Sequence, residues 1–235
     1  MSARFPGESP AYRAAAPPRR RAAGRGRRAL ERVAEQRRAL PPGGPVTAEY
    51  AFDSEDGEVV IEDLFDGHDA LVLYSFMYSQ EITRPCPSCT SIVDSLDGAA
   101  QHLSQRVGLA VVAKSPLPRL RAFAAERGWR NIRLLSSAGS TYNRDYLAER
   151  PDGGQMPMLN VFTRDGDGTV RHFWGSELLY VPAEPDQEPR HVDLIWPIWS
   201  VLDATPEGRG AGWEPRLSYE EEATAAPTGP STRST

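Results

Sequence analysis

The chain reads LVLYSFMYSQEITRPCPSCTSIVDSLDGAAQHL at residues 71–103. Its first eight residues, 71–78, are almost continuously apolar, which is typical of a central strand that is covered on both faces. Apolar residues then recur at helical spacing over residues 92–103, so we expect a helix there that starts near the cysteines. Cys86 and Cys89 therefore stand where a buried strand gives way to a helix.

The residues that follow continue this alternation of strand and helix. Residues 109–113 predict a second buried strand, and residues 132–135 predict a third. Between them, residues 117–127 predict a helix that Gly128 closes and that Ser115-Pro116 starts with an N-cap and a first-turn proline. This order implies parallel strands joined by right-handed crossovers.

Antiparallel hairpins are expected before and after this parallel part. Residues 49–52 and 59–61 flank one turn that contains glycine, and residues 158–163 and 169–173 flank another. Residues 191–203 predict a last helix. The fold class is therefore α/β, with a mixed central sheet, a terminal antiparallel hairpin and helices on both faces.

The ends of the chain differ from the middle in composition. Residues 1–26 mix Pro, Gly, Ala and Arg without periodicity, so we expect a disordered basic arm, followed by a helix over residues 27–40. The folded domain is expected over residues 44–216, with a disordered tail over residues 217–235. Although the whole chain has a net charge of −5, residues 1–40 hold eleven arginines against three glutamates. No aromatic interleaving or DNA-binding motif accompanies these arginines, so we expect a solvated docking helix and no nucleic-acid partner.

Composition excludes several classes of protein. The chain is 40% hydrophobic and 25% charged, which is ordinary for a globular protein. It has no run of about 18 or more apolar residues, so we expect no membrane-crossing helix and no membrane partner. The N-terminus has no apolar signal core, and two cysteines cannot form a disulfide-stapled scaffold. We therefore expect a cytoplasmic protein with reducible thiols.

The cysteine pair allows thiol-disulfide chemistry. A helix N-terminus favours negative charge, so it stabilises a thiolate. Cys86 is nearer the helix start and is expected to attack a disulfide, while Cys89 resolves the mixed disulfide. Arg84 would lower the pKa of Cys86 further, and Pro87 and Ser88 between the cysteines would tune the redox potential. The reaction needs no bound cofactor, but an external donor must supply the electrons.

Two other interpretations of the pair stay open. A zinc site needs four ligands, and His102 lies at a suitable spacing for a third, but no further histidine follows within five residues. Alternatively, Cys86 and Cys89 are two buried structural thiols. Either interpretation would make the protein a binding module instead of an enzyme.

The strand at residues 71–78, the Cys86-Pro87-Ser88-Cys89 turn and Met156-Pro157-Met158 before the last hairpin together resemble the thioredoxin superfamily. More closely, residues 44–216 resemble an uncharacterised bacterial thioredoxin-like family that is labelled as predicted dithiol-disulfide oxidoreductases. The matching segments are LVLYSFM at residues 71–77, PCPSC at 85–89, LAVV at 109–112, GWR at 128–130 and TPEGR at 205–209.

The resemblance assigns further residues to the site. In this superfamily a cis-proline faces the cysteine pair, and Pro157 is the corresponding position. An X-Pro bond is the one place where a cis peptide costs little, although an ordinary trans proline at a strand start is the alternative. Pro85 stands where thioredoxins commonly have tryptophan before the first cysteine.

A second resemblance concerns residues 83–86. Thr83-Arg84-Pro85-Cys86 matches the Thr-x-x-Cys half of the peroxiredoxin signature, in which the hydroxyl and a later arginine polarise a peroxide, while Ser79 occupies the place of that signature's proline. This resemblance implies an alternative in which Cys86 becomes a sulfenic acid and Cys89 condenses with it. The expected substrate is therefore a protein or small-molecule disulfide, or a peroxide.

Two polar features have weaker interpretations. Lys114 ends the second predicted strand, where sites form in open α/β sheets, so it either approaches Cys86 or is solvated. Residues 136–146 are polar and aromatic, and they form either a groove wall or a packed connection.

Overall fold

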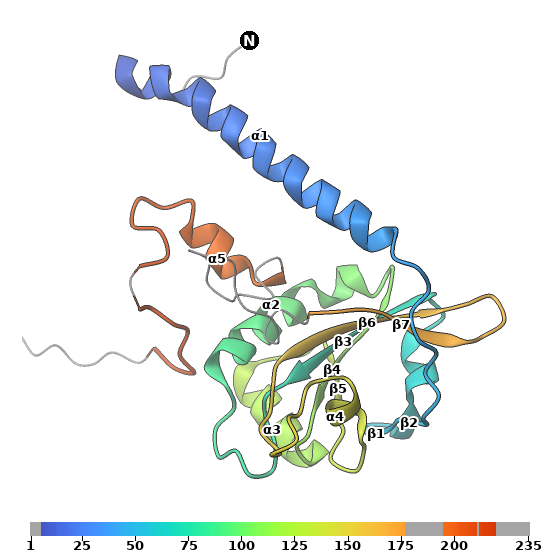
Figure 1. Ribbon diagram of the computed structural model, residues 1–235. Helices are drawn as coiled ribbons and strands as arrows, with labels where there is room; N and C mark the ends of the chain where they lie inside the picture. The colour runs from blue at the N-terminus through green and yellow to red at the C-terminus, as the bar shows by residue number, and fades with distance from the viewer. Residues whose placement is uncertain (1–5, 177–194, 211, 220–235) are drawn as a thin grey trace, which may run out of the picture. The chain divides into compact units, whose positions relative to one another are not determined.

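The computed structural model describes residues 6–176, 195–210 and 212–219 (Figure 1). The chain divides into two compact units, residues 1–44 and residues 45–235. Among the described residues, no helix combines the length and the hydropathy that a bilayer span requires.

The first unit is built on one long helix, α1, Pro10–Arg38. The Ser9 side chain caps it by accepting the N–H of Tyr12 at 3.1 Å, and a proline occupies its first turn. The helix thus starts well before residue 27, where the sequence pattern placed its beginning. Alanine and arginine have high helix propensity, and the helix continues through Pro17-Pro18 although each proline removes a backbone donor.

The second unit contains one seven-stranded sheet in the order β2-β1-β5-β4-β3-β6-β7 (Figure 1). Its strands are β1 Ala51–Ser54, β2 Gly57–Val60, β3 Ala70–Phe76, β4 Gly108–Ala113, β5 Arg133–Ser136, β6 Met158–Arg164 and β7 Val170–Gly175. The central strands β3, β4 and β5 are parallel, whereas β6 is antiparallel to β3. Both expected hairpins are present, as β1–β2 and β6–β7.

Helices connect or follow these strands. They are α2 Pro87–Leu103, α3 Leu117–Arg127, α4 Tyr142–Asp145, α5 Pro197–Leu202 and the 3₁₀-helix η1 Ile61–Phe65. Of the helix expected at residues 191–203, residues 191–194 lie outside the described part of the chain. Its described part begins at Pro197, because proline suits the first turn of a helix.

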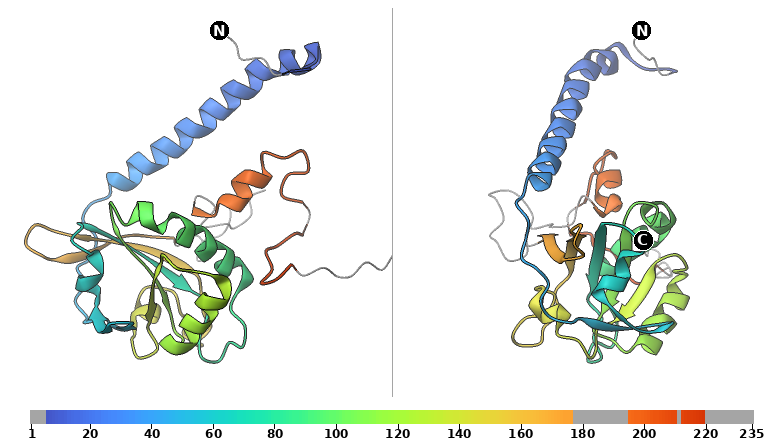
Figure 2. Two further views of the ribbon diagram at one scale, coloured as in Figure 1. Left: turned by 180° about the vertical axis from the view of Figure 1, so that it is seen from behind. Right: turned by 90° about the vertical axis from the view of Figure 1, so that its right-hand side faces the viewer.

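The side chains of β3 alternate between two hydrophobic cores. Tyr74 and Phe76 face α2, α3 and α5, while Leu71 and Leu73 face η1 and α4. All four side chains are at most 1% exposed. The continuous apolarity of residues 71–78 is thereby explained, because helices cover both faces of the sheet (Figure 2).

One helix start differs from its prediction. We expected Ser115 to cap α3, but Pro116 is the N-cap residue and no side chain caps this helix. The Ser115 side chain is fully buried. The other end is as predicted, since Gly128 closes α3 with a φ of 81°.

The connectivity β3-α2-β4-α3-β5, followed by a hairpin that pairs with the far side of β3, is that of a thioredoxin-like fold. The expected α/β class is confirmed. Of the tail expected at residues 217–235, residues 220–235 lie outside the described part. Leu217 is not a free tail residue, because its carbonyl oxygen accepts a hydrogen bond from Arg127 at 2.8 Å.

Candidate active site

Cys86 is the N-cap residue of α2, so its sulfur lies at the helix start. The sulfur accepts the backbone N–H of Cys89 at 3.5 Å, and the Cys86 carbonyl accepts the N–H of Thr90 at 2.9 Å. The Cys86 N–H donates to the carbonyl oxygen of Met77 at 3.3 Å. This bond holds the helix start beside Met77, which directly follows β3.

The two cysteines are free thiols with different environments. Hydrogen bonds from the Cys89 thiol and from the N–H groups of Cys89 and Ser88 lower the pKa of Cys86 to about 6, although burial and the Glu214 carboxylate oppose this. Cys89 is 2% exposed, and its hydrogen bond to Cys86 together with its burial raises its pKa well above 9.0. At neutral pH the pair therefore consists of a partly exposed thiolate and a buried thiol.

The residues before Cys86 differ in their exposure. Thr83 and Arg84 are exposed, whereas Pro85 is buried and Pro87 is partly buried. Arg84 is not among the groups that chiefly set the pKa of Cys86, so the contribution expected from it stays a prediction. The lowering comes from short-range hydrogen bonds, which are stronger than the field of an exposed, solvent-screened guanidinium.

Arg119, in the first turn of α3, fixes the loop that leads to Cys86. Its guanidinium donates to the carbonyl oxygens of Ser79 at 2.8 Å, Gln80 at 3.0 Å and Thr83 at 3.3 Å, and also to that of Ile82. It lies over the Tyr78 ring, 4.3 Å from the ring centroid. Sequence reasoning missed this residue, because its partners are 36–40 positions away and no local pattern marks it.

Pro157 directly precedes β6, which pairs with β3. The cis peptide that we expected there is wrong, because every peptide bond in the described part of the chain is trans. The trans form is the lower-energy state of an X-Pro bond unless its surroundings impose the other isomer. Pro157 is thus an ordinary trans proline at the start of a strand, as in the alternative interpretation.

Lys114 is partly exposed, and its partner is a carboxylate instead of Cys86. Its ammonium forms an ion pair with Glu149. Both line a cavity of about 520 Å³ with residues 79–82 and 152–155, at the carboxyl ends of the parallel strands. The segment 136–146 is packed through Tyr142, which is fully buried in the core, while its Ala138 lines the same cavity.

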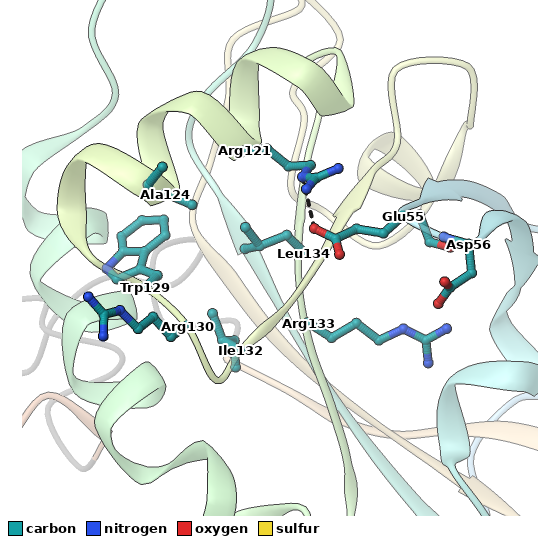
Figure 3. Close-up of a pocket in the computed structure, with 11 residues that line it drawn as sticks. Glu55, Asp56, Arg121, Ala124, Trp129, Arg130, Ile132, Arg133 and Leu134 are labelled. Atoms are coloured by element: carbon teal, nitrogen blue, oxygen red, sulfur yellow. Dashed lines mark hydrogen bonds and ion pairs between the residues drawn. The ribbon is translucent and has the colours of Figure 1, made fainter.

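A second cavity, of about 320 Å³, lies between α3 and the β1–β2 turn. Figure 3 shows Arg121 extending from α3 toward Glu55, with which it pairs at 2.8 Å. Trp129 and Arg133 also line this cavity, and neither cysteine does. We therefore assign it no part in the cysteine chemistry.

The zinc interpretation requires a cluster of ligand side chains. Among the described residues, no group of three or more His, Cys, Asp or Glu side chains could hold a metal ion. His102 is in the last turn of α2, thirteen positions after Cys89, so the two lie about 20 Å apart along the helix.

Aromatic residues near the C-terminus cover α2. Trp196 donates its indole N–H to Ser91 in α2 at 2.7 Å and packs edge-on against Trp199, which in turn contacts Trp213. This chain of contacts brings the adjacent Glu214 close enough to Cys86 to act on its pKa. Nothing in the sequence indicated that Glu214 belongs to the site.

Comparisons with known proteins give a family and several distant structural neighbours. A comparison with curated proteins finds no match. Peroxidoxin BcpB from Mycobacterium tuberculosis is 20% identical with a TM-score of 0.43, over 67% of this chain and 94% of that one. A peroxiredoxin-like protein from Aquifex aeolicus is 16% identical with a TM-score of 0.39, over 56% and 73%. The exposed lipoprotein thioredoxin Etrx1 from Streptococcus pneumoniae is 12% identical with a TM-score of 0.38, over 63% and 98%.

The family match covers nearly the whole chain. Residues 8–223 match the family described as "Bacterial protein of unknown function (DUF899)". This chain, with its thioredoxin-like fold and its Cys-Pro-Ser-Cys turn, is therefore a member of the DUF899 family.

Proposed function

We propose that this protein is a thiol-disulfide oxidoreductase in which Cys86 attacks the substrate and Cys89 resolves the mixed disulfide. The observation that carries the proposal is the asymmetry of the pair. The Cys86 sulfur is partly exposed and has a pKa of about 6, whereas the Cys89 thiol is buried and has a raised pKa. A nucleophile must be accessible and ionised, and a resolving thiol needs neither property until the mixed disulfide has formed.

The reaction consists of two displacements. The Cys86 thiolate attacks one sulfur of a disulfide R–S–S–R′, so that a Cys86–S–S–R bond forms and R′S⁻ leaves and is protonated. The Cys89 sulfur then attacks the Cys86 sulfur, which forms the internal disulfide and releases R–S⁻, and the Cys89 proton passes to that thiolate. The substrate gains two electrons and the pair loses two, so an external dithiol must reduce the pair before the next cycle.

Trapping the intermediate tests this function. A Cys89→Ser variant is expected to accumulate a stable mixed disulfide at Cys86 when it is mixed with an aromatic disulfide, as measured by mass spectrometry. A Cys86→Ser variant should stay unmodified, because Cys89 is buried. Ser95→Ala, which alters another polar residue of α2, is the matched control and should behave as the wild type. Equal reaction of the Cys86→Ser variant would exclude the proposed roles.

A peroxide is the second candidate substrate, because an accessible thiolate of low pKa also reacts with peroxides. Cys86 would then be oxidised to a sulfenic acid while the peroxide is reduced to water, and Cys89 would condense with the sulfenic acid to give the disulfide and a second water. Against this, the exposed Thr83 has its carbonyl, not its hydroxyl, bound by Arg119. A peroxide-dependent sulfenic acid in the Cys89→Ser variant, detected with a carbon nucleophile, would favour the peroxidase.

The cellular setting follows from the chemistry. A pair that is reset by an external reductant suits the cytoplasm, where thiol systems keep cysteines reduced. We therefore propose a cytoplasmic location and a dithiol protein or a small thiol as the electron donor. Recovery of the reduced pair by a thioredoxin system, followed as thiol release, tests this partner class.

A further inference from the structure

Tyr74 is a buried tyrosine of β3 on the face that α2 covers. It is 0% exposed and belongs to the same core cluster as Cys89. Its buried hydroxyl has no partner at full hydrogen-bond geometry, although it is near enough to the Cys89 thiol to interact with it. A buried donor without a partner is unfavourable, so packing alone does not explain why this position carries a hydroxyl. Phe76, two residues further along the same face, is 1% exposed and fills its place without one.

Tyr74 lies in the core cluster that contains Cys89 and against which Cys86 packs. The titratable groups that act on Tyr74 are Cys89 first and then Cys86. Burial raises the pKa of Tyr74 well above 10.0, so the phenol keeps its proton at any working pH. It can therefore donate a hydrogen bond to a sulfur, but it cannot take a proton from one.

Cys89 needs such a donor at one step of the proposed reaction. When its sulfur attacks the mixed disulfide it carries negative charge, and at 2% exposure water does not reach it freely. The groups that lower the pKa of Cys89 are the Tyr74 hydroxyl and the backbone at Met77, whereas Cys86 and burial raise it. In the mixed disulfide the Cys86 sulfur is no longer charged and no longer opposes ionisation of Cys89, and the Tyr74 hydroxyl is a side-chain donor that can stabilise the Cys89 thiolate.

We propose that the Tyr74 hydroxyl donates a hydrogen bond to the Cys89 sulfur while that sulfur attacks the mixed disulfide at Cys86. The inference rests on the proposed function and adds a catalytic residue to its second step. Tyr74 neither gains nor loses a proton: the proton of Cys89 goes to the departing thiolate R–S⁻, and the phenol only stabilises the charge on Cys89 in between.

The two steps can be timed separately with a symmetrical aromatic disulfide whose thiolate absorbs light. One thiolate is released when Cys86 attacks, and the second is released when Cys89 displaces it. In Tyr74→Phe the second release is expected to slow by about tenfold or more, in line with the loss of a hydrogen bond to a charged group. The first release should keep its rate. The pH midpoint of the second release should rise, which a purely structural role would not cause.

Tyr142→Phe is the matched control. Tyr142 is also fully buried, but it lies in the core cluster on the other face of the sheet, so both releases should keep their rates. If Tyr74→Phe does not fold, a protein that carries fluorotyrosine at position 74 and at no other position is used instead. This nearly isosteric phenol is a stronger donor, so it should speed the second release and lower its pH midpoint.

The outcomes separate the two proposals. If the wild type gives no first release, the proposed function itself fails. The role of Tyr74 is overturned if the wild type gives both releases and the second release keeps its rate and pH midpoint in Tyr74→Phe. The same holds for the fluorotyrosine protein where it is used in place of Tyr74→Phe. In either case the proposed oxidoreductase function is unaffected. An equal slowing in Tyr142→Phe also overturns it, because the effect would then be one of packing.

Discussion

Glu214 is the residue whose charge opposes the Cys86 thiolate. Its carboxylate raises the pKa of Cys86 against the hydrogen bonds that lower it. We expect Glu214→Gln to lower the pKa of Cys86 below its present value of about 6. The rate of alkylation of Cys86 as a function of pH measures this, with Glu207→Gln as the control on another exposed carboxylate. An unchanged midpoint would mean that solvent screens Glu214 from the sulfur.

The lowered pKa of Cys86 also predicts a pH dependence of stability. The folded protein loses the proton of Cys86 at about 6, while the unfolded chain loses it near 9.0. The stabilisation is therefore complete above pH 9 and is lost as the pH falls to 6. We expect the melting temperature of the reduced wild type, relative to Cys86→Ser, to rise between these pH values. A constant difference would contradict the lowered pKa.

Among the elements, α3 has an unexpected role, because Arg119 connects it to the loop before Cys86. We expect Arg119→Lys to destabilise the protein by about 1–3 kcal/mol, because one ammonium cannot replace a planar guanidinium that donates to four carbonyls. It should also slow the attack by Cys86. Urea unfolding and the rate of disulfide reaction measure the two effects. Arg121→Lys, on the same helix but paired with Glu55 near the surface, should change neither by much.

The elements were largely predictable because each has a local pattern. The apolar run of β3, the helical spacing of α2 and the glycine that ends α3 all act over a few residues. The same holds for Cys86 and Cys89, which are three positions apart. Arg119, Tyr74 and Glu214 were missed as site residues because their contacts with the cysteine region cross from other elements. The N-cap of α3 was also placed wrongly, because it is Pro116 and not Ser115.

At the scale of the whole molecule, we expect the second unit to fold and react without the first. Both core clusters of the second unit consist of residues from Val46 onward. We therefore expect a chain that starts at Pro45 to keep the melting temperature and the Cys86 reactivity of the full chain. Calorimetry and the aromatic-disulfide assay check this. A shorter chain that starts after Val46 is the contrasting variant, because it loses the hydrogen bond from Val46 to Val170. A large loss of stability in the chain that starts at Pro45 would show that α1 supports the fold.

The tryptophans that pack on α2 are expected to report the redox state of the cysteine pair through their fluorescence. Trp196 and Trp199 share a hydrophobic cluster with Cys89, and disulfides quench indole emission at short range. Oxidation of the pair to the disulfide should thus lower the intrinsic fluorescence, and reduction to the dithiol should raise it. Turnover can then be followed in real time on the unlabelled protein, whatever its natural substrate is.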